Sequence, residues 1–321
     1  MKLVCSLSTK LLLPLAITLA LPAMADTAKP VTVPGDRAFT ESITAGPDGT
    51  LYISSLASGG VLRIKPGATS AEPWIVPGAY ETRSTFGVYA DAKTSTLWAC
   101  SNDVSAFGIP GPSSTPGSYL VAFDLNSGEG KSRYKMPGTA TLCNDMALSD
   151  DGTLYVTNTA APQIFRLKPG AKELELFVED AQMQTSKDPA VDGIAFGSDG
   201  NIYVNTYGLG EFFRIAVKDG KAGAVTKLKP SRPLKFPDGL RHLEGQTFLM
   251  VEAGGTLDRV TIEGDDVKVE TLKDGLDGPA ALIKVGDTIW VAEGKHSHLF
   301  APKENGPPAL PFHVLPIPFG K

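Results

Sequence analysis

The sequence predicts an all-β protein, a six-bladed β-propeller of four-stranded blades. One short motif, an apolar run around an aromatic residue, recurs six times at nearly constant spacing. Each unit also contains about four short runs of β-branched and aromatic residues, separated by Gly, Pro, Asp and Asn. No helical pattern interrupts these runs. Units of this length with four strands each are typical of propeller blades.

The recurring motif is clearest in "TLYIS", "TLYVT" and "NIYVN". Its aromatic position is filled in all six units, by Tyr52, Trp98, Tyr155, Tyr203, Phe248 and Trp290. Successive aromatics are 46, 57, 48, 45 and 42 residues apart. A β-sandwich is the structural alternative, but it would not require one motif to recur six times. The spacing therefore favours the propeller.

Residues 1–25 look like a secretory signal peptide. Two lysines accompany an apolar stretch, residues 11–22, and an Ala-Met-Ala sequence supplies a small-x-small cleavage site. The alternative is a membrane anchor, but about 12 apolar residues that include Pro14 are too few to span a bilayer. We therefore expect a periplasmic or secreted protein whose mature part, residues 26–321, is a single propeller domain with no membrane insertion.

The charge of the chain narrows the choice of partner. The 35 acidic residues outnumber the 30 basic residues, for a net charge of −5, and the basic residues form no run. A mildly acidic surface of this kind argues against a nucleic acid or an anionic lipid as partner.

One insertion interrupts the regular spacing. The segment "SNDVSAFGIPGPSSTPGS", residues 101–118, follows the second strand of the second unit and is rich in Gly, Pro and Ser. In a propeller this connection lies at the same end of the barrel as the start of each innermost strand. The insertion is therefore either a lid or rim over the central channel or a passive surface loop.

Polar side chains share one position relative to the repeat aromatic. Glu41, Asn144 and Asp192 each stand eleven residues before it, and Asp238 stands ten residues before it in a unit with a shorter turn. The first strand of each blade lines the central channel. We therefore expect these four side chains to meet near one mouth of the channel.

Two interpretations of these residues are possible. Clustered carboxylates repel one another and lose hydration, and a divalent cation removes both problems. Oxygen ligands suit a hard cation such as Ca²⁺ or Mg²⁺. Alternatively, each residue caps a turn, as Asp199 is expected to do in the hairpin turn Asp199-Gly200. Three oxygen-bearing side chains in one register, with a fourth nearby, favour the metal site.

Three segments resemble a known family. "FTESITAGPDGTLYIS", "CNDMALSDDGTLYVTNT" and "VDGIAFGSDGNIYVN" are similar to blades of the senescence marker protein/gluconolactonase-like (regucalcin-like) propellers. The resemblance implies a six-bladed propeller that hydrolyses lactones or related esters with a metal at the central channel. It implies Glu41, Asn144 and Asp192 as metal ligands. Ca²⁺ is the expected cation, with Mg²⁺, Mn²⁺ or Zn²⁺ as alternatives.

The same resemblance suggests substrate contacts. In "ETRSTFGVYAD" it assigns a substrate-binding role to Arg83. The next polar position, usually Asn in the family, is Thr85 or Ser84 here, a departure that puts a sugar lactone as substrate in question. Asp238 corresponds to an additional acid that related propellers place near the metal.

The two cysteines outside the leader are a possible disulfide. Cys100 ends the second strand of the second unit, and Cys143 directly precedes Asn144. Both positions fall at the same end of neighbouring blades. In an oxidising compartment a pair of cysteines suggests one bridge, and two buried thiols are the alternative.

These observations predict a metal-dependent lactonase or esterase-like hydrolase. The metal would polarise the substrate carbonyl, and Asp192 or Asp238 would serve as the general base. The alternative is a non-catalytic propeller that binds a partner and keeps a structural metal, because the propeller fold hosts many functions.

Weaker candidates lie near the ends of other units. His296 and His298 alternate along a stretch that reads as a surface strand, and Glu252 and Glu293 either line the rim of the site or cap loops.

Overall fold

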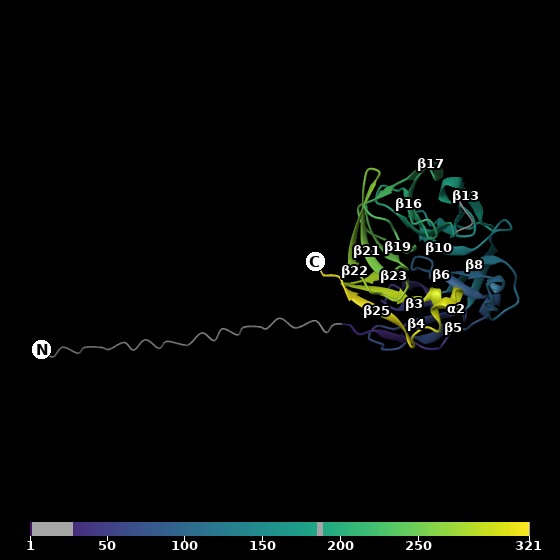
Figure 1. Ribbon diagram of the computed structural model, residues 1–321, viewed down its shortest axis with the longest axis vertical. Coiled ribbons are helices and arrows are strands. Elements are labelled where there is room, and N and C mark those ends of the chain that lie inside the picture. Colours follow the sequence, from purple (N-terminus) through teal and green to yellow (C-terminus); the bar gives the residue numbers. More distant parts are fainter. Residues whose placement is uncertain (2–27, 185–188, 321) are drawn as a thin grey trace.

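Each predicted repeat unit folds into one antiparallel four-stranded sheet, and the six sheets follow one another around a ring (Figure 1). The computed structural model describes Met1 and residues 28–184 and 189–320. The predicted all-β six-bladed propeller is confirmed. The predicted signal peptide lies outside the described residues apart from Met1.

The first three blades run from the innermost strand to the outermost strand in chain order. Blade 1 consists of β2 (Thr40–Ala45), β3 (Leu51–Ser55), β4 (Val61–Ile64) and β5 (Glu72–Ile75). Blade 2 consists of β6 (Ser84–Asp91), β7 (Thr96–Asn102), β8 (Ser118–Asp124) and β9 (Gly130–Lys135). Blade 3 consists of β10 (Cys143–Leu148), β11 (Leu154–Asn158), β12 (Gln163–Leu167) and β13 (Glu175–Glu179).

Blades 4 and 5 keep this order. Blade 4 consists of β14 (Val191–Phe196), β15 (Ile202–Thr206), β16 (Glu211–Lys218) and β17 (Lys221–Lys227). Blade 5 consists of β19 (Pro237–Glu244), β20 (Thr247–Glu252), β21 (Thr256–Glu263) and β22 (Asp266–Lys273). A short strand, β18 (Lys229–Pro230), pairs in parallel with β22 at the outer edge of blade 5.

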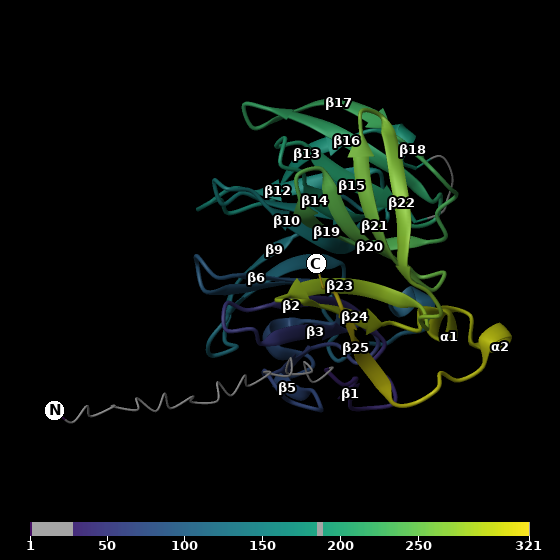
Figure 2. The same ribbon diagram turned by 90° about the vertical axis from the view of Figure 1, so that its left-hand side faces the viewer.

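Blade 6 closes the ring with both ends of the described chain. It contains β23 (Pro279–Val285), β24 (Thr288–Glu293) and β25 (Phe312–Pro318), and its outermost strand is β1 (Val31–Val33). Val31 pairs with Val314 and Val33 pairs with Phe312 (Figure 2). Because the N-terminal strand completes the last blade, the first and last parts of the chain hold the ring closed.

The repeat aromatics pack one blade against another. Tyr155 contacts Phe177 of its own blade at 4.8 Å between ring centroids and Phe196 of the next blade at 5.3 Å. In the same way, Tyr203 of blade 4 packs against Phe248 of blade 5 at 5.0 Å. Aromatic pairs of this geometry stabilise beyond the apolar area that they bury. Aromatic residues of the recurring motif therefore form contacts between neighbouring sheets.

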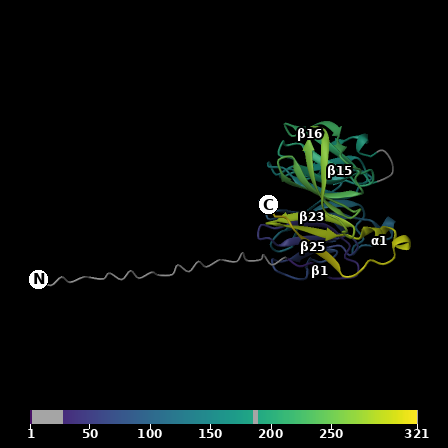
Figure 3. The same ribbon diagram turned by 60° about the vertical axis from the view of Figure 1, so that its left-hand side comes forward.

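The connections at one end of the ring are the longest. Inner strands begin at this end, which we call the channel mouth, and it also carries the loops between second and third strands. In blade 2 this loop is residues 103–117 of the predicted insertion 101–118, whose ends belong to β7 and β8, and it contains a 3₁₀ turn at Ser105–Phe107. In blade 6 it contains α1 (His296–Phe300) and α2 (Pro302–Asn305), which project from the ring (Figures 2 and 3).

The helix α1 corrects one prediction. His296 and His298 lie on a short helix and not on a strand. The turn begins at Lys295, whose φ of 54° ends the extended backbone of β24, and Pro302 starts the second helical turn. Two further 3₁₀ turns lie at Ala79–Glu81 and Ala181–Met183. Within the described residues, no helix is long and apolar enough to cross a membrane.

A disulfide joins blades 2 and 3 at the channel mouth. Cys100 on β7 and Cys143 on β10 are bonded, with their Cα atoms 5.2 Å apart. The Asn102 side chain reinforces this junction, because its Nδ2 donates to the Cys143 carbonyl at 2.8 Å and its Oδ1 accepts from the Cys143 N–H at 2.9 Å. The residue that follows Cys143 is Asn144, so the bridge also fixes the backbone of a predicted ligand.

This bridge leads to a first prediction. Replacing both cysteines by Ser should lower the free energy of unfolding by about 4 kcal/mol, because the bridge closes a long loop in the unfolded chain. Denaturant unfolding of the two proteins measures the difference. Thiol titration of the denatured, unreduced protein should find neither Cys100 nor Cys143 free, and two free thiols would contradict the bridge.

Candidate metal and catalytic site

A β-bulge turns one side chain of each inner strand toward the channel. The pairing of first and second strands shifts register at the same place in blades 1 to 5, directly around Glu41, Phe86, Asn144, Asp192 and Asp238. Blade 6 has the corresponding shift at Ala280. Bulges re-aim side chains and recur beside active sites. We call these six positions the inner ring.

The inner ring brings the four predicted polar side chains together. Glu41, Asn144, Asp192 and Asp238 line one cavity of about 10 Å³, and all four are buried. A space of this size holds one water molecule or one ion. A substrate must therefore lie above the cavity, at the channel mouth.

Asn144 and Asp192 are joined directly. The Asn144 amide nitrogen donates to Asp192 Oδ1 at 2.8 Å and to Thr159 Oγ1 at 2.9 Å. Both amide hydrogens are then used, which leaves the Asn144 Oδ1 as the atom suited to bind a cation.

Burial and neighbouring negative charges raise the pKa of the three buried carboxyls. Burial raises the pKa of Glu41 well above its usual range, and the negative charges of Asp192 and Asp145 raise it further. Burial and the charge of Asp145 raise the pKa of Asp192, while a hydrogen bond with Asp238 opposes the increase. Burial, Asp192 and Glu41 raise the pKa of Asp238. The ionised form of each carboxyl is therefore disfavoured in this cavity.

One ion pair lies just below the inner ring, and the sequence analysis did not anticipate it. Arg241 on β19 makes a bidentate contact with Asp145 on β10, at 2.6 Å from Nη1 to Oδ2 and 3.0 Å from Nη2 to Oδ1. The guanidinium also lowers the pKa of Glu41 and Asp238. Because Asp145 already engages it, Arg241 offsets only part of the charge of the inner ring. The pair crosses the channel between blades 3 and 5 and closes the cavity from below.

A second group of polar residues holds the bulges in place. Ser54, Thr157 and Asn205 each accept a hydrogen bond from the N–H that follows the inner-ring residue of their own blade, at 2.9, 2.9 and 3.0 Å. Thr157 also donates to the Asp192 carbonyl and Asn205 donates to the Asp238 carbonyl, each in the next blade. These residues stand two places after the repeat aromatic. A polar residue at this position of the motif is the feature of the sequence from which these hydrogen bonds could have been predicted.

Glycine follows the inner-ring residue where neighbouring strands approach closely. A Cβ on Gly193 would lie 2.3 Å from the Asp238 carbonyl oxygen, and one on Gly87 would lie 1.9 Å from the Asn144 carbonyl oxygen. The pair Asp192-Gly193 is therefore not a turn. The Asp faces the cavity, and the Gly lets the next blade pack against its backbone.

Arg83 is occupied by the insertion loop. Its Nη2 donates to the Pro110 carbonyl at 2.7 Å, and its Nη1 lies 2.9 Å from Asp103 Oδ2 and 3.4 Å from the Thr115 carbonyl. The guanidinium thus anchors the loop 101–118 at the channel mouth. The predicted contact of Arg83 with a substrate stays a prediction.

Thr85 lies outside the inner ring. Its hydroxyl is buried and approaches the Arg83 carbonyl at 3.4 Å. The strand register instead gives blade 2 an apolar inner-ring residue, Phe86. The predicted substrate contact of Thr85 likewise stays a prediction.

Two acids at the ends of second strands cap loops. Glu252 accepts a hydrogen bond from the Lys235 N–H and forms an ion pair with Arg232 at 2.7 Å. Glu293 accepts from the Asp277 N–H at 2.9 Å. Of the two roles that the sequence left open, these contacts favour loop capping.

His296 lies beside the start of blade 1. Its Nε2 is 3.1 Å from the Thr40 carbonyl oxygen, next to Glu41. Burial lowers the pKa of His296 to about 4, so the ring is neutral at pH 7.

The donor set fits a hard cation, although it does not form a closed cluster of ionisable ligands. In residues 28–184 and 189–320, no three His, Cys, Asp or Glu side chains are arranged as a metal-binding group. The predicted set of Glu41, Asn144 and Asp192 contains only two side chains of those types. Its chemistry nevertheless suits Ca²⁺, because all available donors are oxygens and the cavity has an excess of negative charge.

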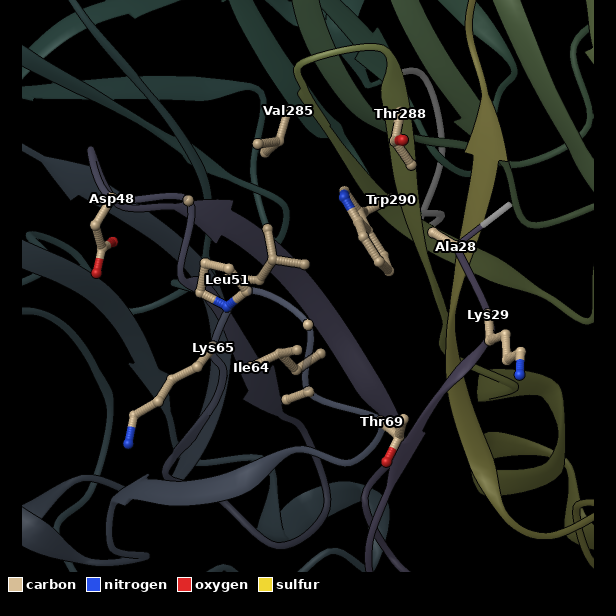
Figure 4. A pocket seen from close by; sticks show the side chains of 14 residues that line it. Ala28, Lys29, Asp48, Leu51, Ile64, Lys65, Thr69, Val285, Thr288 and Trp290 are labelled. Carbon is tan, nitrogen blue, oxygen red and sulfur yellow. The ribbon is translucent and has the colours of Figure 1, made fainter. Parts of the chain in front are cut away.

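A larger hollow lies at the opposite end of the ring, between blades 1 and 6. It has a volume of about 620 Å³ and is lined by residues such as Leu51, Ile64, Lys65 and Trp290 (Figure 4). The turns that border it join first to second strands and third to fourth strands. Asp48 is the only carboxylate among its lining residues, so the smaller cavity at the mouth is the better candidate for chemistry.

Comparison with known proteins shows the fold. No protein-family model and no curated protein sequence matches the chain. Similar solved structures include a gluconolactonase from Xanthomonas campestris, 16% identical, covering 84% of this chain and 94% of that chain at a TM-score of 0.59. A catalytically inactive virginiamycin B lyase from Staphylococcus aureus with quinupristin is 17% identical, covering 82% and 80% at a TM-score of 0.60. A PQQ-bound aldose sugar dehydrogenase from Streptomyces coelicolor is 14% identical. The match covers 91% of this chain and 96% of that chain, with a TM-score of 0.59.

The raised pKa values lead to a second prediction. A carboxyl whose pKa is higher in the folded state than in the unfolded state loses stabilisation as the pH rises through that interval. In chelator-treated protein, the free energy of unfolding should therefore fall as pH rises above the ordinary values of 3.8 and 4.5. The loss should reach about 1.4 kcal/mol for each unit by which a pKa is raised.

Thermal melting across this pH range tests the prediction. Added Ca²⁺ should reduce the loss, and Asp238→Asn should remove part of it. Asp199→Asn is the matched control, because the pKa of Asp199 is lowered by hydrogen bonds in its turn and the variant should keep the loss. Metal-free protein that becomes more stable over the same pH range would contradict the cluster of raised pKa values.

Proposed function

We propose that this protein hydrolyses lactones or related esters at the channel mouth with the help of a divalent cation. The observation that supports the proposal is the convergence of Glu41, Asn144, Asp192 and Asp238 on one cavity, sized for an ion or a water, with too little positive charge around it. A structural likeness to a gluconolactonase is consistent with this chemistry but extends only to the fold.

Glu41, Asn144 and Asp192 are the residues that would hold the cation, which we propose to be Ca²⁺. When bound, such an ion polarises a substrate carbonyl and lowers the pKa of a nearby water. These ligands come from blades 1, 3 and 4. Their positions therefore depend on the closed ring and not on any single blade.

Asp238 is the best-placed general base. It lines the same cavity as Asp192, and it is not needed for the predicted ligand set. In hydrolysis it would take a proton from the attacking water as the water oxygen bonds to the carbonyl carbon. The same proton would then pass to the departing alkoxide oxygen as the ester bond breaks, which leaves Asp238 ionised again.

The proposal places the protein in an oxidising compartment. The bridge between Cys100 and Cys143 supports this placement, because disulfides persist mainly in exported proteins. It agrees with the export signal expected from residues 1–25.

A comparison of two aspartates tests the ligand assignment. Asp192→Ala should abolish most lactone or ester hydrolysis and weaken cation binding, because it removes a charged ligand and the hydrogen-bond acceptor of Asn144. Asp199→Ala should cost about 1 kcal/mol of stability and leave activity intact. Asp199 accepts hydrogen bonds from the Asn201 N–H and the Tyr203 hydroxyl and does not line the channel cavity. Both variants remove an Asp that precedes a Gly.

Hydrolysis of a panel of lactones and aryl esters, together with calorimetric titration of Ca²⁺, provides the two readouts. If Asp192→Ala keeps normal cation affinity and turnover, the metal site is wrong. The protein would then be better described as a propeller that binds a partner without catalysis.

A separate substitution tests the base. Asp238→Asn should lower kcat by about 10²- to 10⁴-fold with little change in cation affinity, because the amide cannot accept the proton. If turnover persists in Asp238→Asn, Asp192 becomes the candidate base. If cation binding is lost instead, Asp238 is a ligand.

A further inference from the structure

We propose that the substrate of this site carries a sizeable apolar group, held between two aromatic pairs that stand on opposite sides of the channel mouth. This inference rests on the proposed hydrolysis and specifies its substrate class. The favoured substrates are lactones or esters with an alkyl or aryl substituent, in place of polyhydroxylated sugar lactones.

The first aromatic pair lies above blade 1. Phe107 belongs to the insertion loop of blade 2, and Phe300 belongs to α1 of blade 6. Their ring centroids are 6.2 Å apart in an edge-to-face arrangement, and the two residues are 67% and 48% exposed. Phe300 also neighbours His296, which contacts the Thr40 carbonyl beside Glu41. The pair therefore spans the loops that flank the Glu41 side of the mouth.

The second aromatic pair lies above blades 4 and 5. Tyr207 follows β15 and Phe236 precedes β19, and their ring centroids are 5.4 Å apart. Phe236 is 53% exposed and stands two residues before Asp238. Burial, and then the charges of Asp238 and Asp192, raise the pKa of Tyr207.

The backbone of Phe236 holds this ring in an unfavourable conformation. Its φ is 56°, a left-handed conformation that a bulky side chain rarely adopts. Strain of this kind persists where the surrounding structure imposes it, and it is frequent at ligand-binding sites.

Blades 2 and 6 contribute apolar residues to the inner ring. In blade 2 its residue is Phe86, and in blade 6 it is Ala280. Blades 6 and 2 flank blade 1, beneath the pair of Phe107 and Phe300. The inner-ring residues on either side of Glu41 are therefore apolar, while blades 3 to 5 carry Asn144, Asp192 and Asp238.

Two cations near the mouth are already engaged. Arg83 binds the insertion loop, and the Lys295 Nζ contacts Asp277 at 3.1 Å and the Ala309 carbonyl at 2.8 Å. A polyhydroxylated substrate would need free donors and acceptors to replace its hydration. Exposed aromatic rings around a polar centre instead match a ligand whose reactive carbonyl is small and whose substituent is apolar.

Most large exposed apolar side chains share this face. Apart from Met1, the large exposed hydrophobic residues among those described are Val76, Tyr80, Phe107, Leu176, Phe236, Phe300 and Leu310. Leu176 alone lies on a strand, β13, away from the mouth loops. Phe107, Phe236, Phe300 and Leu310 lie on loops at the channel mouth, whereas Tyr80 packs against Phe123 and Gly130 at the other end of blade 2. Leu176 offers a control.

The experiment measures kcat/KM on γ-lactones of increasing alkyl length and on phenyl acetate, with glucono-δ-lactone as the polar comparison. The apolar substrates should be hydrolysed at least about tenfold more efficiently than glucono-δ-lactone, since contacts with added methylene groups change specificity by about this factor. The double variant Phe107→Ala/Phe300→Ala and the variant Phe236→Asn should each lower kcat/KM for the longest lactone about tenfold. The loss should be smaller for γ-butyrolactone, which has no alkyl substituent to contact these rings.

Matched controls distinguish the loss of an aromatic ring at the channel mouth from a general loss of folding. Asn tolerates the left-handed backbone at residue 236, so Phe236→Asn removes the ring without added strain. Leu176→Ala removes an equally exposed apolar side chain from β13 and should leave every rate unchanged. Thermal melting should show that all variants are folded.

The outcomes distinguish this inference from the proposed function. Hydrolysis that requires Asp192 but does not increase with alkyl length would overturn the inference and leave the proposed function intact. If no lactone or ester is hydrolysed, the proposed function fails, and calorimetric titration with γ-nonalactone then decides. Binding that Phe236→Asn abolishes would support an apolar-ligand site, whereas no binding would overturn it.

Discussion

The burial of three carboxyl groups at one end of a narrow channel is the constraint on which the rest of this structure depends. Glu41, Asp192 and Asp238 come from three different blades, and burial together with nearby negative charge raises the pKa of each in a cavity with room for one ion or water. Arg241 is the cation that acts on this cluster, but Asp145 already engages it through two hydrogen bonds. Such a cluster is costly unless a proton or a cation supplies the missing positive charge.

Holding these groups together requires a rigid ring, and several features of the fold provide it. The bulges that aim the inner-ring side chains free backbone N–H groups, and Ser54, Thr157 and Asn205 accept hydrogen bonds from them. Gly193 allows blade 5 to approach the backbone of blade 4. Strand β1 completes blade 6, so separation of the blades requires loss of that pairing as well. The repulsive cluster is therefore opposed by contacts distributed over the whole ring.

The channel mouth combines this polar centre with an apolar margin. The loops that carry Phe107, Phe236 and Phe300 belong to blades 2, 5 and 6, and they are longer or more irregular than the turns at the other end. Arg83 fixes the loop of blade 2 through Pro110 and Asp103. A propeller can thus keep its inner ring and change its substrate through the mouth loops alone, which is consistent with the variety of proteins that share this fold.

Much of the fold was predictable because it repeats. A motif that recurs six times marks the same strand in each blade, so the strands that carry Tyr155 and Tyr203 could be assigned to successive blades from the sequence. The common offset of Glu41, Asn144 and Asp192 from that motif also identified one register. Side chains alternate between the two faces of a strand, so the position of a residue relative to the motif predicts which way its side chain points.

Other features depended on contacts between distant parts of the chain. Asp145 and Arg241 are 96 residues apart, and no local pattern pairs them. Phe86 replaces the expected polar residue at the mouth because a bulge, and not the sequence of blade 2 alone, determines which side chain faces the channel. His296 lies on a helix because its segment connects two strands across the mouth.

The sequence by itself therefore determined the number of blades, the register of the acidic and amide residues, and the end of the channel at which they meet. Only the tertiary structure decided the ion pair below them, the engagement of Arg83 by the insertion loop, and the pairing of Phe107 with Phe300. The physical reason is the range of the interactions involved. Hydrophobic periodicity and turn chemistry act within a few residues, whereas charge pairing and loop packing depend on how the closed ring brings separate blades together.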